Sequence, residues 1–155
     1  MAQSKEYIAS TYPLPVYNYR VTIDAITVSF VEVSGLSIEY EPVPYKHGLS
    51  FSMGEKYIPG MRQPVKLSMK KGIVKSNDYL FQWLHKTYTD PSYDNTKRDI
   101  IIDLCDEKGN TVIRWKAQQA LPTKLDAPTF DVNSNDVAIE SMEFIAWNLD
   151  VNYNP

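Results

Sequence analysis

Histidine and cysteine, which often serve as bases, nucleophiles and zinc ligands, are rare in this sequence. There are two histidines, His47 and His85, and one cysteine, Cys105, among 155 residues. They form neither an HExxH motif nor a Cys/His set with the spacing of a zinc site. Cys105 lies within an expected strand, where we favour a packed thiol over a nucleophile. The sequence therefore indicates no metal site, and we expect no cofactor.

Carboxylates are the other candidates for chemistry. Asp103 and Asp106 lie near each other towards the end of one expected strand, and two carboxylates can act as an acid–base pair in hydrolysis. We favour the interpretation that these acids face solvent from the strand. The six glycines form neither a GxxxxGK[ST] nor a GxGxxG phosphate-binding loop. We therefore expect a protein that is not an enzyme, with a small hydrolase using Asp103 and Asp106 as a competing interpretation.

Charge is divided unevenly along the chain. The net charge is -3, which argues against general nucleic-acid binding, yet positions 46–75 hold seven basic residues and one acid. From Asp126 to the C-terminus there are six acids and no Lys or Arg. Two interpretations are open. Either the charges only solvate different strands, or the basic surface of one copy meets the acidic surface of another, because complementary charge steers association.

Alternation of apolar and polar residues with a period of two dominates the sequence and predicts strands. One segment has helical spacing instead, because Leu80, Trp83 and Leu84 follow the capping residues at 76–78. This predicts one helix at about 76–89 in a single domain that spans 1–155. The expected strands lie at 17–24, 27–34, 36–41, 65–70, 99–106 and 112–118, with a last strand or pair of strands at 138–153.

Residues 42–64 break the alternation. The segment contains four prolines and three glycines but is too rich in apolar residues for a solvated loop. Structureless loops of this length are uncommon and usually functional. Either the segment forms an extra hairpin over its own core, or it protrudes as a loop or hairpin that contacts a neighbouring subunit. The contact residues expected in the second case are Tyr45, Lys46, His47, Leu49, Phe51, Met53, Lys56 and Tyr57.

The order of several short motifs gives the chain a family resemblance. Residues 30–39 (FVEVSGLSIE) resemble the strand–Ser-Gly-Leu–strand element of tail tube proteins from contractile phages and phage-tail-like injection systems. Residues 59–72 (PGMRQPVKLSMKKG) are similar to the PG…PxxLxxK[KR]G stretch of that family, and the helical LFQWL at 80–84 comes next. The hairpin at 99–117 and the strand at 139–149 also resemble the family in order and length.

The resemblance implies a mainly β fold, in which two packed antiparallel sheets form a β-barrel or sandwich with one α-helix and the protruding 42–64 segment. It implies a structural subunit of an inner tube. Hexameric rings stack into a hollow conduit, and sheath contraction drives that conduit through a target envelope. The implied partners are further copies of the chain, the sheath protein, baseplate and spike proteins, and cargo or a tape-measure protein in the lumen.

The resemblance also bears on location. Such a subunit is made in the cytoplasm and assembled in a phage tail or a phage-tail-like particle, which is extracellular after release. No apolar run is long enough for a membrane-spanning helix, so we expect no membrane anchor. We also expect no specific nucleic-acid binding.

One polar strand face of such a tube lines its lumen. The alternating strands offer two sets of candidates, and the sequence does not choose between their faces. The lumen-facing candidates are Ser37, Glu39 and Glu41, or Lys66, Ser68 and Lys70. The alternative function is a monomeric small-ligand-binding β-barrel, which would need a mostly apolar interior pocket instead of an assembly surface.

Overall fold

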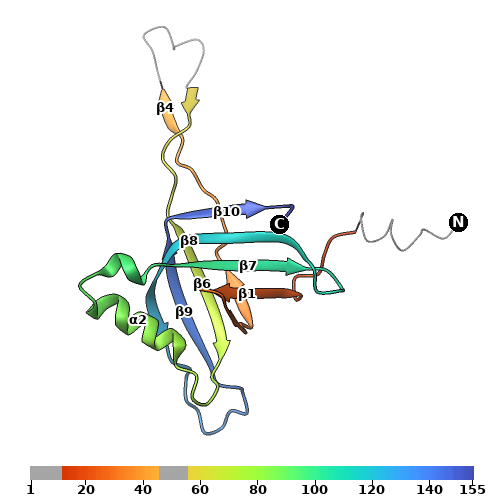
Figure 1. Cartoon of the computed structure of the whole chain (residues 1–155), viewed down its shortest axis with the longest axis vertical. Coiled ribbons are helices and arrows are strands. Elements are labelled where there is room, and N and C mark those ends of the chain that lie inside the picture. Colours follow the sequence, from red (N-terminus) through yellow and green to blue (C-terminus); the bar gives the residue numbers. More distant parts are fainter. Residues whose placement is uncertain (1–11, 46–55) are drawn as a thin grey trace, which may run out of the picture.

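The computed structural model describes residues 12–45 and 56–155 and contains two antiparallel sheets that share one long strand (Figure 1). Sheet A has the order β2 (Ile26–Val28), β1 (Tyr19–Ile23), β7 (Arg98–Cys105), the first part of β8 (Thr111–Asp126) and β10 (Asn148–Asn152). Sheet B contains the second part of β8, β9 (Ile139–Ala146), β6 (Val65–Gly72) and β3 (Glu32–Ser34). The expected mainly β fold with two packed sheets is confirmed as a sandwich. Among the described residues the strand order has two ends, so these strands do not close into a barrel.

Strand β8 passes from one sheet to the other at Gln119 and Ala120. Up to Ala120 it pairs with β7, and from Leu121 onward it pairs with β9. Gln119 has a positive φ of 52°, and its backbone N–H donates to the Asp99 carboxylate at 3.0 Å. Such a local break in the pleat bends a strand. The bend lets a single strand carry both sheets around one core.

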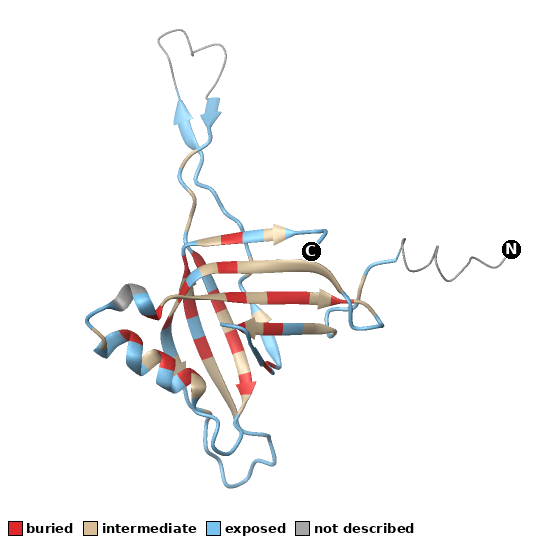
Figure 2. Ribbon diagram, in the orientation of Figure 1, coloured by how far each residue is buried: buried red, intermediate tan, exposed pale blue. Residues whose placement is uncertain are grey.

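The core lies between the inward faces of the two sheets (Figure 2). In β6, Val65, Leu67 and Met69 are buried, while Lys66 between them is exposed. Because side chains of a strand alternate between its two faces, this pattern points one face inward and the other outward. Burying each aliphatic side chain stabilises the fold by about 1.5–3 kcal/mol, so the pattern fixes which face is which.

Helix α2 (Tyr79–Thr89) packs beside β8 at one open side of the sandwich. The buried Trp83 indole N–H donates to the carbonyl of Thr96 at 2.7 Å, at the end of the 3-10 helix η1 (Tyr93–Thr96). The helix begins three residues after the expected position 76, because Ser76 has a positive φ of 63° that a helix does not continue. It is the one α-helix among residues 12–45 and 56–155, and the expectation of a helix near 76–89 is otherwise confirmed.

Two expected strands differ from the structure. The one at 27–34 is divided, since β2 lies in sheet A and β3 in sheet B, and the chain crosses between the sheets at the buried Phe30. The one at 36–41 is wrong, because only Tyr40 forms an isolated bridge there. Gly35 turns the chain away with a φ of +91°, and an added Cβ would lie 2.1 Å from the carbonyl oxygen of Lys66.

A hairpin of β4 (Val43–Tyr45) and β5 (Lys56–Ile58) projects from the body (Figure 1). The expected protrusion of 42–64 is therefore confirmed, and its described part does not fold over its own core. Two segments of the chain, 36–42 and 59–64, connect the hairpin to the body, and we call them the stalk. They approach closely at Gly60, where an added Cβ would lie 1.7 Å from the Glu41 carbonyl oxygen. This close approach explains why a glycine follows Pro59.

Candidate functional site

The outward face of sheet B is mostly polar, and two of its lysines form ion pairs. Lys66, Ser68 and Lys70 project from β6 on this face, opposite the buried members of the strand. The Lys70 ammonium lies 3.3 Å from the carboxylate of Glu32 on β3. Three of the predicted lumen-facing residues therefore share one sheet face.

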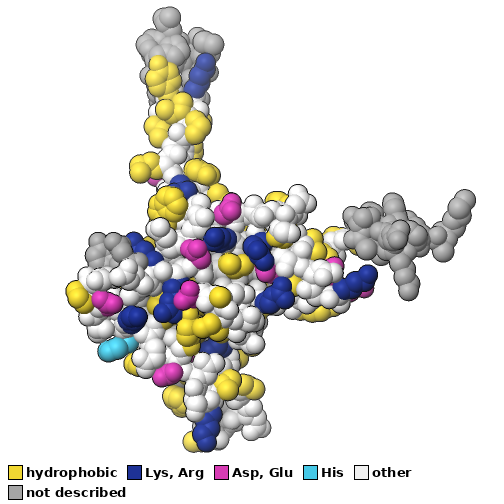
Figure 3. Space-filling view, in the orientation of Figure 1, with side chains coloured by type: hydrophobic (Ala, Val, Ile, Leu, Met, Phe, Trp, Pro, Cys, Tyr) yellow, Lys and Arg dark blue, Asp and Glu magenta, His cyan; other side chains and the backbone are white. Residues whose placement is uncertain are grey.

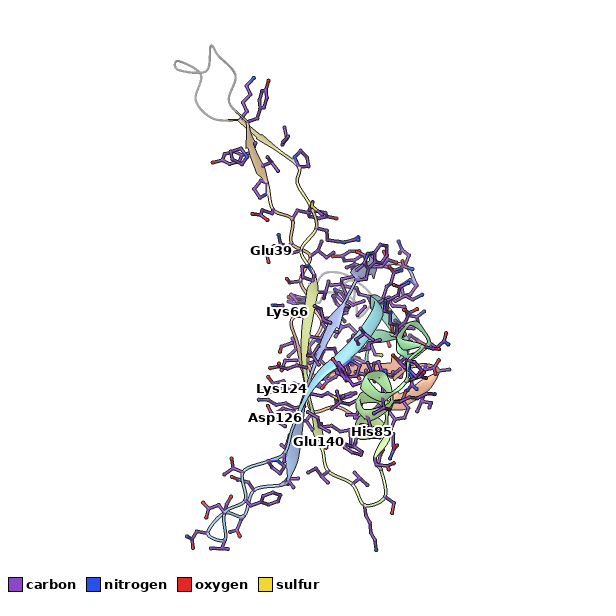
Figure 4. All side chains as sticks on the ribbon, turned by 90° about the vertical axis from the view of Figure 1, so that its left-hand side faces the viewer. Glu39, Lys66, His85, Lys124, Asp126 and Glu140 are labelled. Carbon is purple, nitrogen blue, oxygen red and sulfur yellow. The ribbon has the colours of Figure 1, made fainter. Side chains whose placement is uncertain are left out.

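The same face continues across β9 and β8. Glu143 pairs in register with Ser68 and Lys124, and the Lys124 ammonium lies 3.2 Å from the Asp126 carboxylate. The Asp126 carboxylate raises the pKa of Lys124 above its ordinary value by accepting its hydrogen bond and by its negative charge. The charge of Glu143 raises this pKa further. Figure 4 shows Lys66, Lys124 and Asp126 along one side of the molecule. Bases and acids thus alternate over this surface, with little net charge.

The other predicted lumen-facing residues, Ser37, Glu39 and Glu41, lie on the stalk that leads to the hairpin. All three are exposed. The Gln63 backbone N–H donates to the Glu39 carbonyl at 2.8 Å, and the Gln63 side-chain amide donates to the Glu41 carboxylate at 3.1 Å. Glu39 lies on the same side of the molecule as Lys66 (Figure 4). The two sets therefore occur on one side but on different elements.

The hairpin exposes apolar side chains away from the body. Val43, Tyr45, Tyr57 and Ile58 all lie in β4 or β5 and are each about half exposed or more. Figure 3 shows hydrophobic side chains along its length. Lys56 pairs in register with Tyr45. The other predicted contact residues lie outside the described residues: Lys46, His47, Leu49, Phe51 and Met53.

Arg62 fixes the base of the stalk to the body. Its guanidinium lies 4.5 Å from the centre of the Trp147 ring and donates to the Asn148 side-chain oxygen at 2.8 Å. A guanidinium stacked on an indole and hydrogen-bonded at its edge has a defined direction. Our sequence interpretation missed this residue, because nothing in the pattern brings position 62 next to the turn between β9 and β10.

The end of the molecule opposite the hairpin carries a second group of exposed apolar side chains. Phe130 is 84% and Val132 100% exposed in the connection between β8 and β9. Ile73, also exposed, is held next to this connection, because its N–H donates to the Ala138 carbonyl at 2.9 Å. The sequence interpretation missed these residues, although large apolar side chains among the acids of 126–136 are a detectable signal.

Sheet B has open edges on both sides. Within residues 12–45 and 56–155, β3 pairs only with β6, and the second part of β8 pairs only with β9. Unpaired strand edges of this kind recruit further strands. The sheet is therefore suited to extension by another chain at each side.

The two acids considered for hydrolysis have structural partners, and the expectation that both face solvent is wrong for Asp103, which is buried. Asp103 is 2% exposed and accepts two hydrogen bonds from Arg114, at 2.8 and 3.2 Å, while Arg20 lies 3.7 Å away. These bonds and the carboxylate charge raise the pKa of Arg114. Asp106 accepts the backbone N–H of Lys108 and of Asn110, each at 2.9 Å. The N–H of Asn110, followed by that of Lys108, lowers the pKa of Asp106.

Other potential chemistry is limited in the described part of the chain. Cys105 is buried, which confirms a packed thiol, and its Sγ lies 3.7 Å from the Asp103 carbonyl oxygen. Among residues 12–45 and 56–155, no group of three or more His, Cys, Asp and Glu side chains is placed to hold a metal ion. The same ranges contain no helix with the length and apolarity needed to cross a membrane.

A sandwich with open strand edges and a projecting hairpin is typical of a structural protein that assembles with further copies. Comparison with known proteins identifies its family. The chain matches the family model described as T4-like virus tail tube protein gp19 over residues 15–148. The chain therefore belongs to this tail tube family, and it is a structural subunit of an inner tube. None of the curated proteins matches the chain.

Solved structures of contractile injection systems contain similar chains. One is in the PVC sheath–tube complex of an extracellular contractile injection system in the extended state, with 29% identity, a TM-score of 0.88 and coverage of 98% of this chain and 99% of that chain. A second is in the PVC sheath/tube terminator, with 30% identity, a TM-score of 0.83 and coverage of 93% and 99%. A third is in the tube-terminating cap of the anti-feeding prophage, with 28% identity, a TM-score of 0.84 and coverage of 92% and 93%.

Proposed function

We propose that six copies of this tail tube subunit form a ring, and that rings stack into a hollow conduit driven through a target envelope by sheath contraction. The observation that carries the proposal is sheet B, which has open edges on both sides and a polar, ion-paired outward face. Open edges expose unpaired N–H and C=O groups, and closure of a ring removes them. Six-fold symmetry comes from the family resemblance.

The strand directions of sheet B suit closure of such a ring. Neighbours along β8, β9, β6 and β3 are all antiparallel, so β3 runs opposite to β8. A copy related by rotation about an axis along the strands keeps these directions. The β3 strand of one copy beside the β8 strand of the next then forms another antiparallel pair. Copies would join into one continuous antiparallel wall without reversing any strand.

We place the outward face of sheet B on the lumen, with Lys66, Ser68 and Lys70 among its lining residues. Its lysines alternate with Glu32, Asp126 and Glu143. A polar wall whose charges are balanced neither holds apolar segments nor strongly attracts cargo of one charge sign. Ser37, Glu39 and Glu41 would then lie towards the mouth of the lumen at each ring, where the stalk leaves the sheet.

We place the contact between rings at the hairpin. Its described apolar residues and Lys56 would meet the opposite end of a subunit in the next ring, which exposes Phe130 and Val132. That end also carries Asp131 and Asp136, acids that Lys56 of the hairpin would meet. A contact between two different surfaces repeats indefinitely and builds a filament. The stacking residues proposed are Tyr45, Lys56 and Tyr57, together with Lys46, His47, Leu49, Phe51 and Met53, which lie outside the described residues.

The proposed partners are the sheath protein around the tube, baseplate and spike proteins at its end, and cargo or a tape-measure protein inside. Similar chains occur in structures described as a sheath–tube complex and a sheath/tube terminator, which supports a sheath partner. The action is mechanical and needs no catalysis, in keeping with the structural partners of Asp103 and Asp106. The subunit would be made in the cytoplasm and released within the particle.

Electron microscopy of the purified protein over a range of concentrations tests this proposal. Negative staining is expected to show six-fold rings and tubes built from them. Sedimentation velocity supplies the matching measurement in solution, where ring-sized species should appear as concentration rises. A protein that stays monomeric throughout, with no rings on the grid, would contradict the proposal and favour the small-ligand-binding alternative.

A further inference from the structure

Helix α2 carries a second apolar stripe, separate from the one that packs on the core. Trp83 and Thr87 face the core and are buried. Phe81 and Tyr88, seven residues apart, are 52% and 64% exposed, and the His85 ring stacks on that of Phe81 with centroids 5.9 Å apart. Residues seven apart lie on one side of a helix, and a helix that is apolar on two sides is usually covered on both.

This stripe lies next to one edge of sheet B. The Tyr88 hydroxyl donates to the carbonyl oxygen of Pro122 at 2.9 Å, in the second part of β8. Figure 1 shows α2 at the side of the sandwich where sheet B ends with β8. The exposed helix stripe and the β8 edge therefore belong to one side of the subunit.

An apolar groove of about 720 Å³ lies next to the other edge of sheet B. Val31, Glu32 and Val33, in and before β3, contribute to its wall. The exposed fractions of Tyr17 and Val31 are 81% and 59%. The residues that matter for the groove are Tyr17, Val31, Glu32, Val33, Leu104 and Trp115. Exposed apolar surfaces of this extent usually mark contact sites for a partner.

We propose that α2 of each copy docks its Phe81–Tyr88 stripe into this groove of the neighbouring copy in the ring. The inference rests on the ring described under Proposed function. The stripe flanks the β8 edge and the groove flanks the β3 edge, so joining β3 and β8 of neighbouring copies brings both surfaces to one boundary.

This contact adds a second layer to the ring. Helix α2 lies on the side of sheet B opposite the outward face that carries Lys66 and Lys124 (Figure 4). Strand pairing would close the wall at the lumen, and helix docking would close it further out. Two contacts at different radii resist opening of the ring better than one, as a tube pushed through an envelope requires.

Cross-linking of two single-cysteine variants tests the proposed contact. Phe81→Cys and Val31→Cys are purified separately and treated with a flexible bismaleimide, either alone or mixed in equal amounts. Only the mixture is expected to give covalent dimer, about tenfold above either variant alone, because the proposed contact joins two different surfaces. The wild-type chain is the control for Cys105, which is buried. Equal dimer in the mixture and in the single variants would overturn the inference.

A charge placed in the contact gives an independent test. Phe81→Asp and Val31→Asp should each weaken ring formation by about 30-fold or more, the effect expected for loss of a buried anchor. Gln82→Asp, next to Phe81 on another side of the helix, is the matched control and should form rings as the wild type does. If wild-type rings form and Phe81→Asp forms them equally well, the helix contact is wrong and the tube function stands. If the wild type itself forms no rings, the proposed function fails.

Discussion

Asp103 on β7 lies between two arginines of sheet A. It is in register with Arg20 on β1 and with Arg114 on β8, the two strands that flank β7. Its carboxylate is nearly inaccessible, at 2% exposure, and both of its oxygens accept hydrogen bonds from Arg114. A buried carboxylate is stable when it is paired and hydrogen-bonded in this way. At the scale of residues, Asp103 therefore links the three strands β1, β7 and β8.

Asp106 makes stability depend on pH. Its pKa lies below the ordinary value of 3.8, because the N–H groups of Asn110 and Lys108 stabilise the carboxylate. The stabilisation is present above pH 3.8 and is lost as pH falls through the lowered pKa. Asp106→Asn should be less stable at neutral pH and should lose this part of the acid dependence. Thermal unfolding between neutral and acid pH measures both effects.

The neighbouring acid in the same turn supplies the control for that measurement. Glu107→Gln removes one carboxylate from the turn and should follow the wild-type pH profile. If Asp106→Asn and Glu107→Gln change the profile equally, the hydrogen bonds of the turn are not its cause.

At the scale of elements, Gly35 determines where β3 ends and the stalk begins. Its φ is +91°, and an added Cβ would lie 2.1 Å from a backbone carbonyl oxygen of β6, which has no freedom to move aside. Gly35→Ala should lower the free energy of unfolding by about 2–4 kcal/mol. Gly72→Ala is the matched control, because nothing lies within 4 Å of its added Cβ. Chemical denaturation of both variants measures the difference, and equal stability would refute the role given to Gly35.

Arg62 should control the direction of the hairpin. Arg62→Gln removes the contact with the Trp147 ring and the hydrogen bond to Asn148, at a cost of about 1–2 kcal/mol in stability. Rings should still form, but tubes should become shorter, because a hairpin without a fixed direction stacks less well. Tube lengths in negatively stained images and amide hydrogen exchange in 56–63 give the readouts. If amide exchange becomes faster while tube length stays unchanged, the direction of the hairpin does not control the stacking of rings.

Period-two alternation predicted the strands well where one face is buried throughout. In β6 the buried Val65, Leu67 and Met69 alternate with polar residues, and this is why Lys66, Ser68 and Lys70 could be assigned to one face. The same alternation at 36–41 predicted a strand that does not form. Alternation indicates only that a segment has one polar and one apolar side, and it does not show whether the segment pairs with another strand. The bend of β8 at Gln119 has no apolar signal, since it depends on a positive φ and a contact with Asp99.

At the scale of the whole molecule, exposed apolar side chains lie on the hairpin, seen at the top of Figure 3, and in the connection between β8 and β9, at the opposite end of the long axis in Figure 1. Two different ends that complement each other favour head-to-tail stacking over a closed dimer.

Substitution at the end opposite the hairpin should therefore separate stacking from ring formation. Phe130→Ser combined with Val132→Ser should change the free energy of unfolding by no more than about 0.5 kcal/mol, because both side chains are exposed. Rings should persist and tubes should be lost in electron micrographs. Ile26→Ser, at an exposed position on β2 at the edge of sheet A, is the control and should leave tubes intact. Normal tubes from the double variant would exclude this surface from the ring-to-ring contact.

The central claim is that neighbouring copies complete sheet B around a channel. A cryo-electron microscopy reconstruction of the assembled particle measures this directly. We predict that β3 of each subunit pairs with the second part of β8 of its neighbour, and that Lys66, Ser68 and Lys70 face the channel. A reconstruction in which sheet A or helix α2 lines the channel, with the edges of sheet B unpaired between copies, would contradict the claim.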